Sequence, residues 1–376
     1  MKLIAFLGHH KVGSSALQTY LGRNALALLR RDILYPAVEG QGLATLLMMA
    51  LSNPDGTMPD WPEGIEQPVN LREAHNALAF AMLAEHRGKD VPPLHEGLPR
   101  SGDMLRIIER QIEVFSPDVT ILAAEVFANF APISPKLIRR LLRSFSGAEI
   151  TFTATLRRPD EYLVAWHGQR MRFGQKVAPL PAALDNYVRN LHFNYRKMLE
   201  GWITVCPEAD LRLRTYDDVR QAGGSVQDFM NGFGLPLPED PARIPRVNES
   251  LHRAFFEIAR QANATLPPGA GQELFHRLLG LGGHPDLPDR NEIEMYGAEA
   301  RARMADAFEP IHDWLGEVSG RAPFFEDVEE IGRTRPVPEH DAARAALAIL
   351  RGPAGADLPE SLREFLASLE LEPNFE

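Results

Sequence analysis

Short apolar runs alternate with longer stretches of helical periodicity along this chain. Strand-forming residues gather in four runs, at 3–7, 119–123, 150–156 and 211–215. Apolar residues recur at helical spacing near 16–31, 70–87, 102–115, 135–143, 160–173, 182–200, 249–263 and 290–317. Strands separated by helices predict an α/β fold, a three-layer α/β/α arrangement with a central parallel sheet and right-handed crossovers. In such folds, ligands bind at the carboxyl ends of the strands.

The remaining segments are less regular. Residues 52–69 and 88–101 are rich in proline and glycine and lack periodicity, which predicts long loops or lids over a pocket. The part after about residue 321 has an acidic patch, a Pro/Arg connector and two short helical patterns, near 340–351 and 358–369. We therefore expect an α/β domain over 1–320 and a helical C-terminal extension over 321–376.

Composition narrows the class of protein. The chain has 376 residues, of which 44% are hydrophobic and 24% charged, so it is long enough to bury a full core. A net charge of -11 argues against a dedicated nucleic-acid binder, which needs a broad basic surface. The single cysteine, Cys206, excludes an internal disulfide and a multi-cysteine metal site. No apolar run is long enough for a transmembrane segment or a signal-peptide core, which predicts a cytoplasmic protein.

The stretch after the first predicted strand has the layout of a phosphate-binding loop. Residues 3–7 run into the octapeptide GHHKVGSS, and a helical pattern follows at once. Successive backbone N–H groups and the positive end of a helix would meet a phosphate there, while Lys11 and the hydroxyls of Ser14 and Ser15 complete the cradle. It is not a Walker A sequence, because that motif puts its lysine after the second glycine, whereas Lys11 precedes Gly13.

A second constellation follows the predicted strand at 150–156. Arg157 and Arg158 end the strand, and Pro159 stands where a first helical turn tolerates a missing N–H. The planar guanidinium of Arg157 at a strand end suits a phosphate, to which it can donate two charge-assisted hydrogen bonds. The alternative interpretation is that either arginine pairs with nearby acids.

Together these segments resemble the sulfotransferases that use 3′-phosphoadenosine-5′-phosphosulfate (PAPS). The stretch HKVGSSALQ, including Val12, is similar to their 5′-phosphosulfate loop, and Lys11, Gly13, Ser14 and Ser15 match it position by position. The stretch RRPDEYLVAWHGQ is similar to their 3′-phosphate motif. Arg157 matches that motif, but Ala165 stands where the family usually has a serine.

Two weaker segments extend the resemblance. Tyr216 and the two aspartates after it resemble the Y-E-D segment of the family, whose tyrosine lies near the adenine. Asn248 and Ser250 belong to a stretch similar to the R-x-N-x-S turn of bacterial members. Alone, such a tyrosine is more often a core residue, and N-E-S before a helix is more often a cap. The resemblance spans roughly residues 1–265 and implies a P-loop NTPase-like sulfotransferase fold with all these positions contacting PAPS.

The resemblance implies transfer of a sulfuryl group from PAPS to a hydroxyl or amine of a carbohydrate or small-molecule acceptor, by in-line displacement and without a metal. Lys11 would stabilise the leaving oxygen. A general base must take the proton of the acceptor. We expect Glu125 in this role, because the apolar strand before it should raise its pKa. His10, beside Lys11, is the second candidate. Glu39 is the third, since its placement resembles that of the glutamate base in Golgi-type sulfotransferases.

Other interpretations stay open. A nucleotide-dependent phosphotransferase with a degenerate P-loop would need Mg²⁺ held by the loop hydroxyl and by a strand-end acid such as Glu125. A non-catalytic nucleotide-binding protein is a third possibility. His167 and Gln169 follow Arg157 on the same predicted helix, so they would either line the acceptor pocket or lie on the surface.

Overall fold

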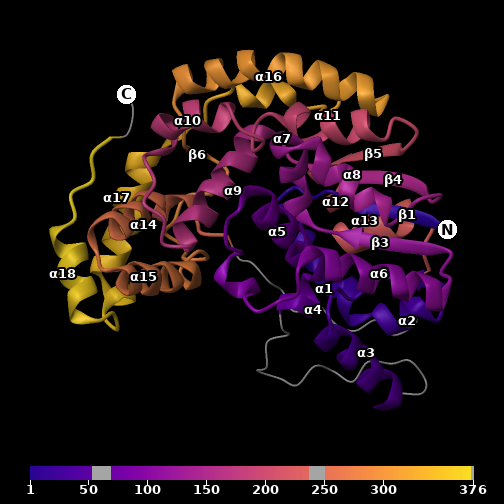
Figure 1. The fold of residues 1–376 in the computed structure, drawn as a ribbon. Coiled ribbons are helices and arrows are strands. Elements are labelled where there is room, and N and C mark those ends of the chain that lie inside the picture. The colour runs from indigo at the N-terminus through magenta and orange to yellow at the C-terminus, as the bar shows by residue number, and fades with distance from the viewer. Residues whose placement is uncertain (53–68, 237–249, 374–376) are drawn as a thin grey trace. The chain divides into compact units, whose positions relative to one another are not determined.

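The computed structural model describes residues 1–52, 69–236 and 250–373, which form two compact units (Figure 1). The first unit comprises residues 1–157, 195–247 and 314–324. The second unit comprises residues 158–194, 248–313 and 325–376. This division differs from the expected boundary between residues 320 and 321, because the C-terminal segment clusters with two earlier segments of the chain.

The first unit is built around a parallel sheet, as the alternation of strands and helices predicted. Within the described residues this sheet has five strands in the order β2-β3-β1-β4-β5. Ile4 in the central strand pairs with Ile121 on one side and with Thr151 on the other. The strands are β1 (Lys2–Phe6), β2 (Ile33–Leu34), β3 (Val119–Ala123), β4 (Glu149–Leu156) and β5 (Asp210–Thr215), all parallel to their neighbours.

One face of the sheet packs against the helices that follow β1 and β5. Ile4 and Phe6 share this face because side chains alternate along a strand. They form one buried cluster with Leu17 and Leu21 of α1 (Ser14–Arg23) and with Phe229 of α13 (Ser225–Gly232). The apolar residues of α1 recur at helical spacing, so their burial holds this helix against the sheet.

The opposite face packs against aromatic residues. Phe152 of β4 is in register with Ala5, and its ring centroid lies 5.2 Å from that of Trp202 in α11 (Tyr195–Val205). Trp202 is fully buried and stacks on Phe130 of α7 (Phe130–Ile133) at 6.0 Å. Helices therefore cover both faces of the sheet, so its polar groups can meet a ligand only at the strand ends.

The strand order indicates which edge of the sheet could bind a ligand. The chain runs from β1 to β2 at the margin, returns to β3, and then crosses β1 to reach β4. The connections that leave β1 and β3 therefore run in opposite directions, and such divergence opens a crevice outside the carboxyl ends of the strands. The other helical elements of this unit are α2 (Ala25–Leu29), α3 (Gly40–Ser52), α4 (Val69–Arg72), α5 (Ala74–Arg87), η1 (Pro93–His95), α6 (Ser101–Phe115), η2 (Glu125–Asn129), α8 (Pro135–Arg143) and α12 (Tyr216–Gln221).

The second unit is mainly helical. Its core includes Phe193, Phe308 and Phe325, with ring centroids 5.5 and 6.1 Å apart for successive pairs. The two C-terminal helices expected as an extension do form, and α17 packs against η3 and α14 of this unit. The elements are α9 (Pro159–Arg172), α10 (Leu180–Val188), η3 (Arg253–Phe255), α14 (Phe256–Thr265), α15 (Pro268–Gly280), β6 (Ile293–Glu294), α16 (Ala298–Ser319, which extends into the first unit), η4 (Val328–Ile331), β7 (Val337–Pro338), α17 (Glu339–Arg351), η5 (Pro353–Gly355) and α18 (Glu360–Ser368).

Some elements differ from the sequence prediction. The single helix expected at 182–200 is two helices, α10 and α11, with residues 189–194 between them. The helices α3 and α15 were not predicted, and both begin in glycine- or proline-rich sequence that resembles a loop. The expected lid at 52–69 lies almost wholly outside the described residues, whereas 88–101 contains η1. Over the described residues, no helix combines the length and the apolar character needed to cross a membrane.

Candidate active site

The ends of four parallel strands carry most of the predicted site residues. The loop 8–13 follows β1, Glu125 follows β3, Arg157 follows β4 and Tyr216 follows β5. Because these strands are parallel and adjacent, their carboxyl ends lie at the same edge of the sheet. Residues separated by more than 200 positions in the sequence are thereby gathered at one edge.

The loop after β1 has an unusual backbone. Gly8 and Gly13 have φ of 84° and 88°, and Lys11 between them has φ of 61°. A side chain in this left-handed region costs roughly 1–2 kcal/mol, so the surrounding structure must hold Lys11 in place. Backbone that alternates between right- and left-handed conformations turns successive N–H groups toward one point, which favours an anion.

Close packing explains why the loop begins and ends with glycine. A Cβ on Gly8 would lie 2.4 Å from Cα of Glu125, which no real structure accommodates without moving the backbone. A Cβ on Gly13 would lie 2.9 Å from Oγ of Ser225, and that hydroxyl donates a hydrogen bond to the carbonyl of Gly13 at 2.9 Å. The loop is thus clamped between the start of η2 and the start of α13.

The helix that follows the loop has an open N-terminus. Gly13 occupies the N-cap position of α1 and has no side chain to accept a hydrogen bond, and the first turn contains no acidic residue. The first N–H groups of a helix need an acceptor, and they carry about half a positive charge. The start of α1 therefore favours a phosphate or sulfate group.

The two serines of the loop have different environments. Ser14 is buried, and its hydroxyl donates a short hydrogen bond to the carboxylate of Glu125. Ser15 is half-buried and makes no side-chain hydrogen bond with the described residues. Val12 is buried, so only its backbone can face a ligand. Of the two hydroxyls, that of Ser15 is the one available to an anion at this helix.

Glu125 is a half-buried anchor of the loop. One carboxylate oxygen accepts the hydrogen bond of Ser14, and the other lies 3.1 Å from Nδ1 of His10. Burial alone would raise the pKa of Glu125, but His10, the hydrogen bond of Ser14 and the charge of Lys11 outweigh burial and lower it. The expected rise in this pKa is therefore wrong, because the neighbouring donors and cations favour the carboxylate.

Arg157 and Tyr216 lie together at the ends of β4 and β5. The guanidinium of Arg157 is 5.0 Å from the centroid of the Tyr216 ring, a cation–π distance. Tyr195 donates a hydrogen bond of 2.6 Å to the carbonyl of Arg157, and its ring packs edge-to-face against His9 at 5.3 Å. Tyr195 thus connects the loop after β1 with the end of β4.

Arg158 has a structural environment that differs from that of Arg157. It is buried, and its guanidinium binds the carboxylate of Asp160 at 2.7 Å and also that of Asp327. The pairing with nearby acids, considered above for both arginines, therefore applies to Arg158. Arg157 is half-buried at the sheet edge.

Several other candidates lie in places that constrain their roles. Glu39 caps α3: its two oxygens accept hydrogen bonds from the backbone N–H groups of Gln41 (2.5 Å) and Gly42 (2.6 Å). Ser250 is exposed, and Asn248 lies outside the described residues. Ala165 and Gln169 are half-buried on α9.

His167 is a core residue and not part of the surface. It is buried, its Nδ1 is 2.9 Å from the hydroxyl of Tyr187, and its ring stacks on Phe256. Burial, together with the positive charges of Arg170 and Arg260, lowers the pKa of His167 to about 3. The imidazole is therefore neutral in the folded protein at ordinary pH.

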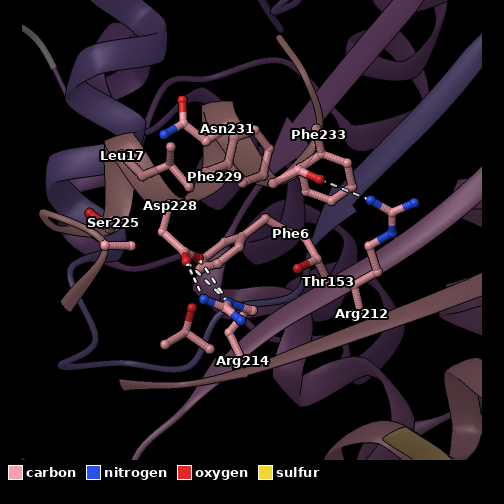
Figure 2. Close-up of a pocket in the computed structure, with 13 residues that line it drawn as sticks. Phe6, Leu17, Thr153, Arg212, Arg214, Ser225, Asp228, Phe229, Asn231 and Phe233 are labelled. Atoms are coloured by element: carbon pink, nitrogen blue, oxygen red, sulfur yellow. Dashed lines mark hydrogen bonds and ion pairs between the residues drawn. The ribbon is translucent and has the colours of Figure 1, made fainter. Parts of the chain in front are cut away.

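A pocket of about 440 Å³ adjoins the loop on the α1 and α13 face (Figure 2). Its lining includes Ser225, whose hydroxyl holds Gly13, and the pair of Arg214 with Asp228 at 2.7 Å. Arg212, also in the lining, binds Asp210 at 2.7 Å and the carbonyl of Gly232 at 3.0 Å. Both arginines of this pocket are thus engaged with acids of their own.

Sequence reasoning missed two residues that shape the site. Tyr195 and Ser225 contact the loop from segments about 180 and 210 positions further along the chain, and Tyr195 also contacts the end of β4. Ser225 follows two glycines at the start of a helix, which is a detectable capping signal. Nothing in the sequence identifies Tyr195.

Neither a metal-binding cluster among the described residues nor a similarity to known proteins assigns a function to this site. Among the described residues, no group of three or more His, Cys, Asp and Glu side chains is placed to hold a metal ion. A scan against protein-family models and a search of the curated proteins find no match to this chain. The candidate site therefore depends on its own geometry.

The tight approach of Gly8 to Glu125 predicts a specific loss of stability. Gly8→Ala should lower the free energy of unfolding by about 2–5 kcal/mol, since it combines left-handed strain with steric overlap. Gly97→Ala is the matched control, because Gly97 has φ of 78° but open space around its Cβ position, and it should cost only about 1–2 kcal/mol. Urea denaturation measures both variants, and equal losses would contradict the steric argument.

The burial of His167 predicts a pH-dependent stability difference. The unfolded chain binds a proton at this residue near pH 6.5 whereas the folded chain does so only near pH 3, so the native protein loses stability as pH falls between these values. His167→Gln removes this loss. The advantage of the native protein over H167Q should shrink by up to about 1.4 kcal/mol per pH unit from pH 6 to pH 4, measured by urea denaturation. A constant difference would show that the imidazole is not buried in the neutral form.

Proposed function

We propose that this chain is a PAPS-dependent sulfotransferase, which transfers a sulfuryl group to a hydroxyl or amine of a carbohydrate or small-molecule acceptor. The observation that carries the proposal is the loop between β1 and α1. In it, a lysine in the left-handed conformation stands between two left-handed glycines, ahead of a helix N-terminus that no side chain caps. This combination presents an amine, converging N–H groups and a helix dipole to an anion.

The chain offers groups for each part of PAPS. The N–H groups at the start of α1 and the hydroxyl of Ser15 would hold the 5′-phosphosulfate. Arg157 would bind the 3′-phosphate through its planar fork, and its contact with Tyr216 supports an adenine near that ring. Ala165 brings no hydroxyl to the 3′-phosphate, so that phosphate depends more heavily on Arg157. Ser250 and Asn248 are retained as candidates from the family resemblance.

PAPS supplies the sulfuryl group and a bridging oxygen that becomes negatively charged as the group departs. The amine of Lys11 would stabilise that charge. The left-handed backbone of Lys11 fixes the direction in which its side chain leaves the loop.

We propose that His10 is the general base that takes the proton of the acceptor, and that Glu125 positions His10. The lowered pKa of Glu125 makes it a weaker base than the sequence suggested. Its carboxylate lies 3.1 Å from Nδ1 of His10, which favours a proton on that nitrogen and leaves Nε2 to accept one. A histidine base oriented by a neighbouring carboxylate is a recurring catalytic arrangement.

One observation favours a Mg²⁺-dependent nucleotide phosphotransferase instead. The hydroxyl of Ser14 contacts the carboxylate of Glu125, and a loop hydroxyl with a strand-end acid is the pair that holds Mg²⁺ in P-loop enzymes. The position of Lys11 before Gly13 argues against this alternative, because in those enzymes the lysine follows the second glycine. A non-catalytic nucleotide-binding protein would show binding without turnover.

Nucleotide preference separates these functions. The sulfotransferase should bind adenosine 3′,5′-bisphosphate without a metal more tightly than ATP with Mg²⁺, as measured by isothermal titration calorimetry. Arg157→Ala should weaken binding of the bisphosphate by roughly 10- to 100-fold, because a charge-assisted contact with the 3′-phosphate is lost.

Adenosine 5′-monophosphate provides the control for this titration, since it lacks the 3′-phosphate. Its affinity should change little in the Arg157→Ala variant. An equal loss for both nucleotides would show that Arg157 does not read the 3′-phosphate, and a preference for ATP with Mg²⁺ would favour the phosphotransferase.

Lys11 allows charge and backbone conformation to be tested separately. Lys11→Ala and Lys11→Gly should both lower sulfuryl transfer from PAPS by roughly 100-fold or more, assayed over a panel of hydroxyl and amine acceptors, because both lack the amine. Lys11→Gly should in addition stabilise the fold by about 1 kcal/mol relative to Lys11→Ala, since glycine adopts φ of 61° without strain. Undiminished transfer in either variant would overturn the role of Lys11.

A further inference from the structure

A buried arginine of the second unit has no partner among the residues that the structure describes. Arg253, in η3, is 8% exposed, and its Nε lies buried without an acceptor. Over residues 1–52, 69–236 and 250–373, its guanidinium makes no hydrogen bond or ion pair. Proteins rarely bury an arginine in this way, because an uncompensated charge away from water costs several kcal/mol.

Arg253 lines a pocket of about 310 Å³ within the same unit. The three other arginines of the lining are each engaged with acids. Arg158 binds Asp160 and Asp327, Arg301 binds Glu294 at 2.7 Å, and Arg335 binds Glu330 at 2.6 Å. Arg253 is therefore the guanidinium of this pocket that lacks a counter-ion among the described residues.

The electrostatics of the pocket favour a ligand with one negative charge. Burial and the positive charge of Arg290 lower the pKa of Arg253 more than Tyr296, Glu161 and Asp160 raise it, and a guanidinium stays charged under all ordinary conditions. Glu161, Asp160, Asp327 and Glu330 also line the pocket, so a ligand with two or more negative charges would meet repulsion. A single carboxylate matches the planar fork of one arginine and adds only one charge.

We propose that this pocket binds a small polar molecule through one carboxylate, which pairs with the guanidinium of Arg253. The volume is at the small end for a ligand site, and most of the lining side chains are polar or charged, with Val164 and Met295 as apolar exceptions. A hydroxylated carboxylate the size of a sugar acid fits this chemistry. The site lies wholly within the second unit, and it does not depend on the proposed transfer of a sulfuryl group.

Calorimetry on the full chain with probes of defined charge tests the site. The singly charged probes are lactate, 4-hydroxybenzoate and D-glucuronate, the neutral probe is D-glucose, and the doubly charged probe is glucose 6-phosphate. At least one carboxylate should bind, glucose should not, and glucose 6-phosphate should bind at least tenfold more weakly than the best carboxylate. No binding by any of the three carboxylates, or tighter binding of the phosphate, would overturn the proposal.

Substitution of Arg253 gives a second, independent readout. Arg253→Met keeps most of the side-chain volume and removes the charge, so it should weaken carboxylate binding by roughly 10- to 100-fold. Without ligand, the same variant should melt at the same temperature as the native protein or higher, because it removes an unpaired buried charge. Arg335→Met is the matched control, since it removes a paired arginine from the same pocket and should lower the melting temperature.

A purely structural role of Arg253 would give the opposite pattern. Arg253→Met would then melt below the native protein, as Arg335→Met does, and that result overturns the proposal. Lys11→Ala should bind the carboxylate probe as the native protein does. Failure of the sulfotransferase function and failure of this site are therefore distinguishable.

Discussion

The half-buried carboxylate of Glu125 holds the candidate active site together. It accepts the hydroxyl of Ser14 at the start of α1, contacts His10 within the loop, and follows directly from β3. Its backbone also occupies the space that any side chain on Gly8 would need. These donors and the charge of Lys11 stabilise its negative charge and lower its pKa despite the partial loss of water. The same contacts fix where the loop leaves β1 and where α1 begins, so the shape of the loop is set by β3 as much as by its own glycines.

Much of the fold follows from the sequence, because buried parallel strands are apolar on both faces and stand out in the pattern. The ends of β1, β3, β4 and β5 lie within one residue of the predicted ends. β2 contains only two residues, which is too short to give a periodicity. The division into α10 and α11 was invisible because helical spacing continues on both sides of residues 189–194. The clustering of 325–376 with earlier segments depends on long-range packing, which local pattern does not carry.

The candidate site, like the fold, could be predicted where it depends on local sequence and not where it depends on contacts between distant segments. A contiguous motif such as the loop around Lys11 could be read directly, because its spacing reflects backbone geometry. Contacts between distant segments could not be predicted. Tyr195 has no local signal, and the sequence around Glu125 shows only the apolar strand before it. That strand predicts desolvation of the carboxylate but not its contact with His10, and so it predicts the wrong direction for the pKa of Glu125. His167 shows the complementary limit: the helical pattern allowed a surface position, whereas the side chain is buried.

At Lys11, the backbone shape of the loop and its positive charge have different requirements. The backbone shape is compatible with glycine and, at modest cost, with asparagine, whereas the positive charge belongs to the lysine alone. A chain of this design can therefore lose its amine and keep the backbone shape of the loop. Among proteins built on such a loop, the backbone shape is expected to persist after the amine has been lost, and one side chain is enough to mark the difference.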